Sequence, residues 1–173
     1  LTGSEKLADV KDSDIIVITA GLARKPGMAR EDLLNKNAAI LKEICSVIKE
    51  TAGNAMVLVV TNPLDLMTRV ALKVTGFSPQ KVFGMGVSLD AARFANLISL
   101  VTKVPVTQIE PRVIGSHGEG MMPLAGPTKV RGKALASVLD PAAIKELAEK
   151  TVGRGLAIVT LLGSGSAYYA PSA

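Results

Sequence analysis

The chain contains no tryptophan, one cysteine and one histidine, and only 3% of its residues are aromatic. A single cysteine excludes an internal disulfide, and Cys45 lies among apolar residues of a predicted helix, so we expect a packed thiol in a cytoplasmic protein. No apolar run is long enough to cross a membrane, and no membrane partner is expected. Lysine and arginine are interleaved with acidic residues and lack neighbouring aromatics, so the net charge of +5 favours an anionic small molecule over nucleic acid.

Hydrophobic residues make up 48% of the 173 residues, which is enough to bury a core. The first half alternates strand and helix patterns. We expect strands over 14–20, 56–60 and 82–83, and helices over 31–51 and 63–75, the second ending at Gly76. The strands are apolar on both faces, as in a parallel sheet. This order predicts a parallel α/β arrangement.

The pattern changes near Gly86, where we place a domain boundary between residues 1–86 and 87–173. Ser88 is the expected N-cap of a helix over 89–102. Short strands are expected near 113–114 and 129–130, and Asp140 followed by Pro141 predicts the start of a last helix. The second half therefore mixes helices with short strands.

The single histidine, His117, lies in a glycine-rich stretch with Asp90 and Arg93 upstream. Imidazole is the one side chain that ordinarily exchanges protons near neutral pH, and an aspartate can hold it in one tautomer. Asp90 and Arg93 are three residues apart and share a helix face, where the guanidinium could grip a carboxylate. The structural alternatives are a turn histidine and a surface ion pair.

Five motifs in order carry a resemblance to a known family. They are Ala23-Arg-Lys-Pro-Gly-Met-Ala-Arg30, Asn37, Val60-Thr-Asn-Pro63, Leu89-Asp-Ala-Ala-Arg93 and Gly115-Ser-His-Gly118. Together the motifs resemble the lactate/malate dehydrogenase family, and among its branches the malate dehydrogenases of lactate dehydrogenase type. The resemblance implies an α/β fold: a partial Rossmann-type parallel sheet followed by part of an α+β substrate domain. It implies that residues 1–86 are the C-terminal part of the dinucleotide-binding domain.

The resemblance also implies catalytic roles. His117 would take the proton of the substrate 2-hydroxyl while hydride passes to the nicotinamide, and Asp90 would stabilise its protonated form. Arg93 would clamp the C1 carboxylate, and Arg30 would polarise the carbonyl in the reverse direction. Ser166 would line the substrate pocket. The implied cofactor is NAD, contacted by Gly21, Asn37, Val60, Thr61 and Asn62, of which Asn62 would also touch the substrate.

Substrate choice rests on Arg24, which resembles the arginine that meets the distal carboxylate of malate or oxaloacetate. A buried cation without a partner is costly, so pyruvate should be rejected. The alternative is a solvated loop arginine. No metal is expected, and the resemblance implies a homodimer or homotetramer.

The chain has no G-x-G-x-x-G phosphate cradle and no initiating methionine, so we expect a fragment of a longer enzyme. Two other functions stay open: a lactate or other 2-hydroxyacid dehydrogenase, and an inactive remnant that acts as a binding module. A reading frame that extends upstream into the phosphate cradle would favour an enzyme. Missing strands would leave apolar sheet edges and faces bare.

Overall fold

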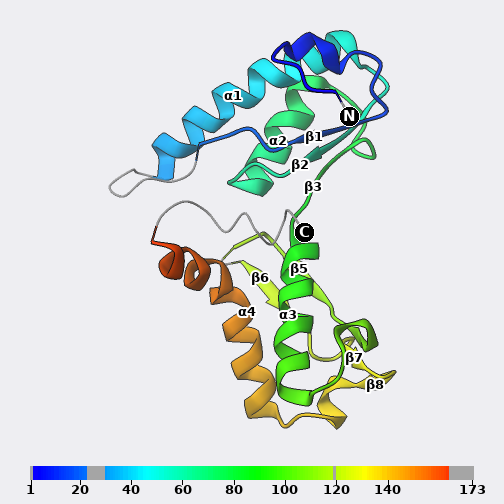
Figure 1. Ribbon diagram of the computed structural model, residues 1–173, viewed down its shortest axis with the longest axis vertical. Helices are drawn as coiled ribbons and strands as arrows, with labels where there is room; N and C mark the ends of the chain where they lie inside the picture. The colour runs from blue at the N-terminus through cyan, green and yellow to red at the C-terminus, as the bar shows by residue number, and fades with distance from the viewer. Residues whose placement is uncertain (1, 23–29, 119, 164–173) are drawn as a thin grey trace. The chain divides into compact units, whose positions relative to one another are not determined.

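The computed structural model describes residues 2–22, 30–118 and 120–163, with two compact units, Leu1–Met85 and Gly86–Ala173 (Figure 1). Among the helices of these residues, none is both long enough and apolar enough to span a membrane.

The first unit is built on a parallel sheet in the order β1–β2–β3. The strands are β1 (Ile15–Ile18), β2 (Met56–Val59) and β3 (Val82–Gly84), with Ile15 opposite Met56 and Val57 opposite Val82. Helix α1 (Arg30–Thr51) joins β1 to β2, α2 (Leu64–Thr75) joins β2 to β3, and the 3₁₀ helix η1 (Leu7–Val10) precedes β1. The predicted parallel α/β order is confirmed.

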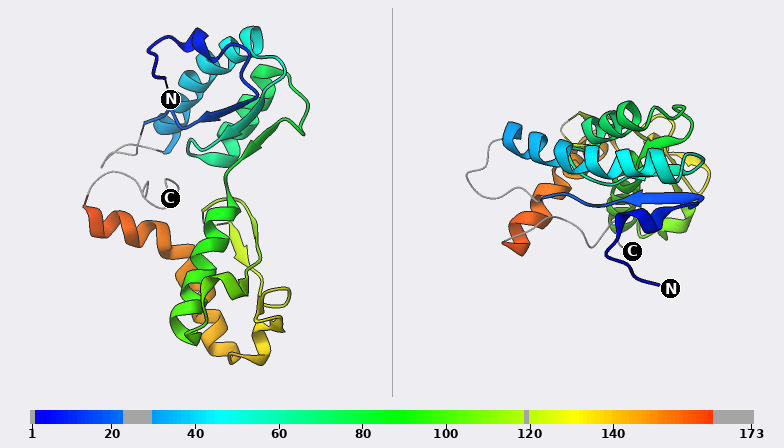
Figure 2. Two further views of the ribbon diagram at one scale, coloured as in Figure 1. Left: turned by 45° about the vertical axis from the view of Figure 1, so that its right-hand side comes forward. Right: turned by 90° about the horizontal axis from the view of Figure 1, so that it is seen from above.

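Helices α1 and α2 lie side by side on one face of this sheet (Figures 1 and 2). Alternate strand residues on that face are buried together with Leu41, Ile48 and Met67 of the helices, and each such side chain contributes about 1.5–3 kcal/mol. The other face carries the exposed side chains of Ile15, Val17, Met56 and Phe83. This exposure agrees with the expectation of a bare apolar face on the sheet, because both connecting helices pack on the same side.

The end of α2 follows its sequence signals. Gly76 adopts a left-handed conformation with φ 69° and donates its N–H to the carbonyl of Leu72, as predicted for the residue that ends this helix. The peptide bond between Asn62 and Pro63, immediately before α2, is cis.

The second unit combines two long helices with short antiparallel strands. The helices are α3 (Val87–Thr102) and α4 (Pro141–Leu162). One sheet has the order β4 (Ile109–Glu110), β7 (Lys129–Val130), β8 (Lys133–Ala134), and β5 (Val113–Gly115) pairs with β6 (Met121–Pro123). The 3₁₀ helices are η2 (Val106–Gln108) and η3 (Leu135–Ser137). Strands β4, β6 and β8 are additions to the predicted set.

The two helix starts of this unit differ in how well the sequence predicts them. Asp140 caps α4 by accepting a hydrogen bond from the Ala143 N–H at 2.9 Å, as predicted. The predicted cap at Ser88 is wrong, since α3 begins at Val87, two residues before the predicted start, with Gly86 as its N-cap. Val87 packs against the core of this unit, and that contact draws the residue into the first turn.

Candidate functional site

Helix α3 places an acidic and a basic side chain on one face, one turn apart. The Arg93 Nη1 donates to the Asp90 Oδ1 at 3.1 Å. The Asp90 side chain is fully buried, and that of Arg93 is 10% exposed. A surface ion pair, the structural alternative for this pair, is therefore excluded.

The β5–β6 hairpin brings the histidine to the same helix. His117 follows directly on β5, and its Nδ1 lies 2.7 Å from the Asp90 Oδ2. Gly115 adopts φ +93°, and a Cβ there would lie 2.2 Å from the Gly120 carbonyl oxygen. Only glycine fits this turn, which explains why the hairpin can carry the imidazole so close to α3.

Both oxygens of Asp90 are therefore engaged by basic groups, one each from His117 and Arg93. An ionised carboxylate only accepts hydrogen bonds, so the proton between Asp90 and His117 belongs to Nδ1 of the ring. This tautomer leaves the lone pair of the neutral imidazole on Nε2, and proton exchange with a ligand falls to that atom. His117 is part-exposed at 19%, which gives a small molecule access to the ring.

The Arg93 guanidinium has an unmet donor. Its Nε is buried and finds no hydrogen-bond partner among the described residues. Leaving a buried donor unpaired costs about 1–3 kcal/mol, more for a charged group. The Arg93 side chain keeps 10% exposure, and the remaining donors of a guanidinium suit a carboxylate ligand. Gly155 of α4 lies next to the same group, where an added Cβ would be 3.7 Å from Nη1.

A second cluster lies at the carboxyl ends of β1 and β2 in the first unit. Asn37 accepts the Leu22 N–H at 2.8 Å and donates to the carbonyls of Leu22 and Asn62, at 3.3 and 2.7 Å. The Thr61 hydroxyl donates to the Ala20 carbonyl at 2.7 Å. This edge is where parallel α/β sheets bind ligands.

The structure thus brings two sets of predicted site residues together, each within its own unit. Asp90, Arg93 and His117 form one set. Gly21, Asn37, Val60, Thr61 and Asn62 form the other, where the Val60 N–H donates to the Ile18 carbonyl at 2.8 Å. Arg24 and Ser166 lie outside the described residues, and Arg30 begins α1 without a described side chain.

Sequence reasoning overlooked Gly155 and the Thr61 contact with Ala20. A glycine inside a helix pattern costs about 1 kcal/mol relative to alanine, so the Gly153-Arg154-Gly155 stretch was a usable signal for close packing. The Thr61 contact had no signal, because a hydroxyl that bonds a backbone 41 residues away leaves no local pattern.

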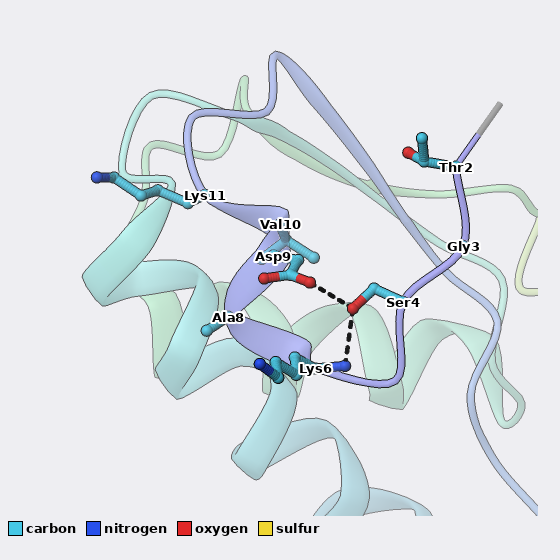
Figure 3. A pocket seen from close by; sticks show the side chains of 8 residues that line it. All are labelled: Thr2, Gly3, Ser4, Lys6, Ala8, Asp9, Val10 and Lys11. Atoms are coloured by element: carbon cyan, nitrogen blue, oxygen red, sulfur yellow. Dashed lines mark hydrogen bonds between the residues drawn. The ribbon is translucent and has the colours of Figure 1, made fainter.

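A surface pocket lies on the segment before β1 (Figure 3). There the Ser4 hydroxyl donates to the Asp9 carboxylate and accepts the Lys6 N–H at 3.0 Å. The pocket is lined only by residues between Thr2 and Lys11, none of them a predicted site residue. Within the described residues there is also no cluster of His, Cys, Asp and Glu that could hold a metal ion.

A buried carboxylate that orients an imidazole, beside a guanidinium with an unmet donor, defines a site for proton transfer with an anionic small molecule. Comparison with known proteins agrees with this class. Residues 1–84 match the family model described as "lactate/malate dehydrogenase, NAD binding domain". A malate dehydrogenase of Methanosarcina mazei is 49% identical over 173 residues, which is 100% of this chain and 56% of that protein. The chain belongs to the lactate/malate dehydrogenase family.

Solved structures show the same likeness. The malate dehydrogenase of Aeropyrum pernix matches with a TM-score of 0.93 at 38% identity, over 99% of this chain and 55% of that chain. A lactate dehydrogenase of Cryptosporidium parvum, solved with lactic acid and nicotinamide adenine dinucleotide, has a TM-score of 0.92 at 34% identity, over 98% and 55%. The chain spans about half the length of the curated relatives it matches.

Proposed function

We propose that the protein containing this chain is an NAD-dependent malate dehydrogenase, which transfers hydride reversibly between (S)-malate or oxaloacetate and the nicotinamide. The observation that carries the proposal is the double use of the buried Asp90, whose two oxygens hold His117 and Arg93. The malate dehydrogenase relatives at 49–50% identity favour this substrate over lactate.

The carboxyl edge of the parallel sheet fits the binding of NAD. Gly21, Asn37, Val60, Thr61 and Asn62 lie at the carboxyl ends of parallel strands, where a dinucleotide binds in such sheets. When bound, the cofactor supplies or accepts the hydride. We propose that residues 1–86 are the C-terminal part of the dinucleotide-binding domain and 87–173 the N-terminal part of the substrate domain.

The substrate would be held and deprotonated by residues of the second unit. Arg93 binds the C1 carboxylate through the terminal guanidinium donors that Asp90 does not use. His117 accepts the 2-hydroxyl proton at Nε2, and the Asp90 carboxylate stabilises the imidazolium that results. In the reverse direction the same imidazolium returns the proton to the carbonyl oxygen.

Roles for the remaining predicted residues come from the resemblance alone. Arg30 would polarise the substrate carbonyl, Asn62 would contact substrate and cofactor, and Ser166 would line the pocket. Arg24 would bind the distal carboxylate, which pyruvate lacks, and so reject pyruvate strongly.

Assays of NADH oxidation with oxaloacetate and with pyruvate test this function, using the complete reading frame that encodes the chain. We expect oxaloacetate to be preferred by about 10³-fold or more in kcat/KM. In the Arg24→Gln variant, turnover of oxaloacetate should fall and that of pyruvate rise relative to it. Preference of the native protein for pyruvate would reject the malate assignment, and unchanged selectivity in the variant would reject Arg24 as the discriminating residue.

A cytoplasmic homodimer or homotetramer is part of the proposal, with a role in carboxylic acid metabolism such as the tricarboxylic acid cycle. Helix α3 exposes the apolar side chains of Leu100 and Val101 and is the candidate interface element. Sedimentation of the complete protein checks this, and a monomer at micromolar concentration would contradict it.

A further inference from the structure

Asn37 is a buried polar residue whose side chain, within the described part of the chain, bonds only to backbone. It lies in the first half of α1 and is 1% exposed. Its oxygen accepts the Leu22 N–H, and its nitrogen donates to two carbonyls, of Leu22 and Asn62. A carboxamide offers two donors and an acceptor oxygen with two lone pairs, and residues 22 and 62 use three of these four hydrogen-bonding positions.

The backbone after β1 is pressed closely against this side chain. A Cβ on Gly21 would lie 3.4 Å from the Asn37 Cγ and 2.6 Å from the Thr61 Cγ2. Thr61 holds the same segment from the other strand, through the Ala20 carbonyl. The ends of β1 and β2 are therefore tied together by two buried polar side chains.

We propose that Asn37 is a positioning residue: its carboxamide fixes the backbone of Leu22 relative to that of Asn62 before any ligand binds. This deepens the proposed function and rests on it. The resemblance places Asn37 among the cofactor contacts, whereas its burial and its bonds assign the carboxamide to the protein backbone. Leu22 stands two residues before Arg24, and Asn62 is a predicted contact of substrate and cofactor, so Asn37 acts on both ligands through these loops.

Steady-state kinetics of the complete protein separate positioning from contact. In Asn37→Ala, we expect the KM for NADH and the KM for oxaloacetate to rise together, each about tenfold, the loss that one or two hydrogen bonds produce. A direct cofactor contact would raise the KM for NADH alone, and that result would overturn the proposal. Thr75→Val is the matched control. Thr75 is 2% exposed, and its hydroxyl donates to the Ala71 carbonyl at the C-terminal end of α2, whereas Asn62 precedes the N-terminal end of that helix. Its kinetic constants should stay native.

Amide hydrogen exchange at Leu22, measured by NMR, tests whether Asn37 holds the Leu22 backbone, and this measurement does not depend on enzymatic activity. In the native protein we expect slow exchange before NADH is added and little change afterwards. Asn37→Asp keeps an acceptor oxygen and should retain protection of the Leu22 amide, whereas Asn37→Ala should lose it. Fast exchange in the NADH-free native protein would overturn the proposal even if neither variant folds. If turnover is absent while the Leu22 amide is protected, the malate dehydrogenase function is rejected, and the role of Asn37 in fixing the Leu22 backbone is retained.

Discussion

Replacement of Asp90 by asparagine tests the site most directly, because the two residues have the same shape. The asparagine has one acceptor oxygen, whereas the native carboxylate serves His117 and Arg93 with one oxygen each. If the oxygen stays with His117, the amide N–H₂ faces the Arg93 donor. If the amide is turned round, it donates to Nδ1 and moves the imidazole proton to Nε2, which then cannot accept one.

Either orientation leaves one buried group without its partner. A hydrogen bond to a charged group contributes about 1.5–3 kcal/mol, so we expect the variant to be destabilised by about that amount. The catalytic loss should be larger. A misoriented or wrongly protonated general base forfeits about 10²–10⁴-fold, and we expect kcat/KM for oxaloacetate to fall within that range.

Urea unfolding and steady-state assays of the complete protein measure the two effects. Asp140→Asn is the matched control: Asp140 is exposed, caps α4, and asparagine caps helices equally well. The control should keep native stability within about 0.5 kcal/mol and native turnover. An Asp90→Asn variant with native kcat/KM would refute the assignment of Asp90 as the partner that orients His117.

Two further predictions concern the core and the hairpin. Burial raises the pKa of the Cys45 thiol from 9.0 to about 11, so the unfolded chain loses this proton first as pH rises. Below pH 9 the thiol is protonated in both states, and between pH 9 and 11 its ionisation in the unfolded chain lowers the free energy of unfolding by about 2–3 kcal/mol. The Cys45→Ala variant lacks this loss, and equal pH dependence of urea unfolding in both proteins would refute the prediction. Gly115→Ala should destabilise the β5–β6 hairpin and abolish turnover, since its Cβ would lie 2.2 Å from the Gly120 carbonyl oxygen. Gly126→Ala is the control and should stay active, because the space around Gly126 is open. Native activity of Gly115→Ala would refute the claim that only glycine fits this turn.

The parts of the fold that the sequence predicted correctly depend on local signals. Apolar strand patterns and helical spacing gave β1, α1, β2, α2 and β3 in their order. Gly76 and Asp140 marked a helix end and a helix start, because a left-handed residue and a side-chain cap are properties of single positions. Ser88 failed as a cap for the opposite reason: packing of Val87 against the core decided where α3 begins.

The grouping of Asp90, Arg93 and His117 was predictable from the sequence, whereas the burial of this group was not. Spacing alone favoured a solvated surface ion pair for Asp90 and Arg93, and only burial by sequence-distant elements excludes it. The unmet Arg93 Nε has the same origin, since no sequence pattern records which donors a packed guanidinium can use. Ile15 and Val17 are exposed because α1 and α2 pack on the other face of the sheet, and the composition of the strands does not determine which face the helices cover.

Each unit relies on one buried polar residue of a helix to join segments far apart in sequence. Asp90 reaches His117 across 27 residues, and Asn37 reaches Leu22 and Asn62 across 15 and 25. A helix holds such a side chain rigidly, while the segments that it holds are turns and strand ends with few constraints of their own. Because an unpaired buried polar group is costly, each of these contacts has one favourable arrangement. This explains how loops can present reactive groups at fixed positions: their geometry is set by the helix side chain that they bond, more than by their own sequence.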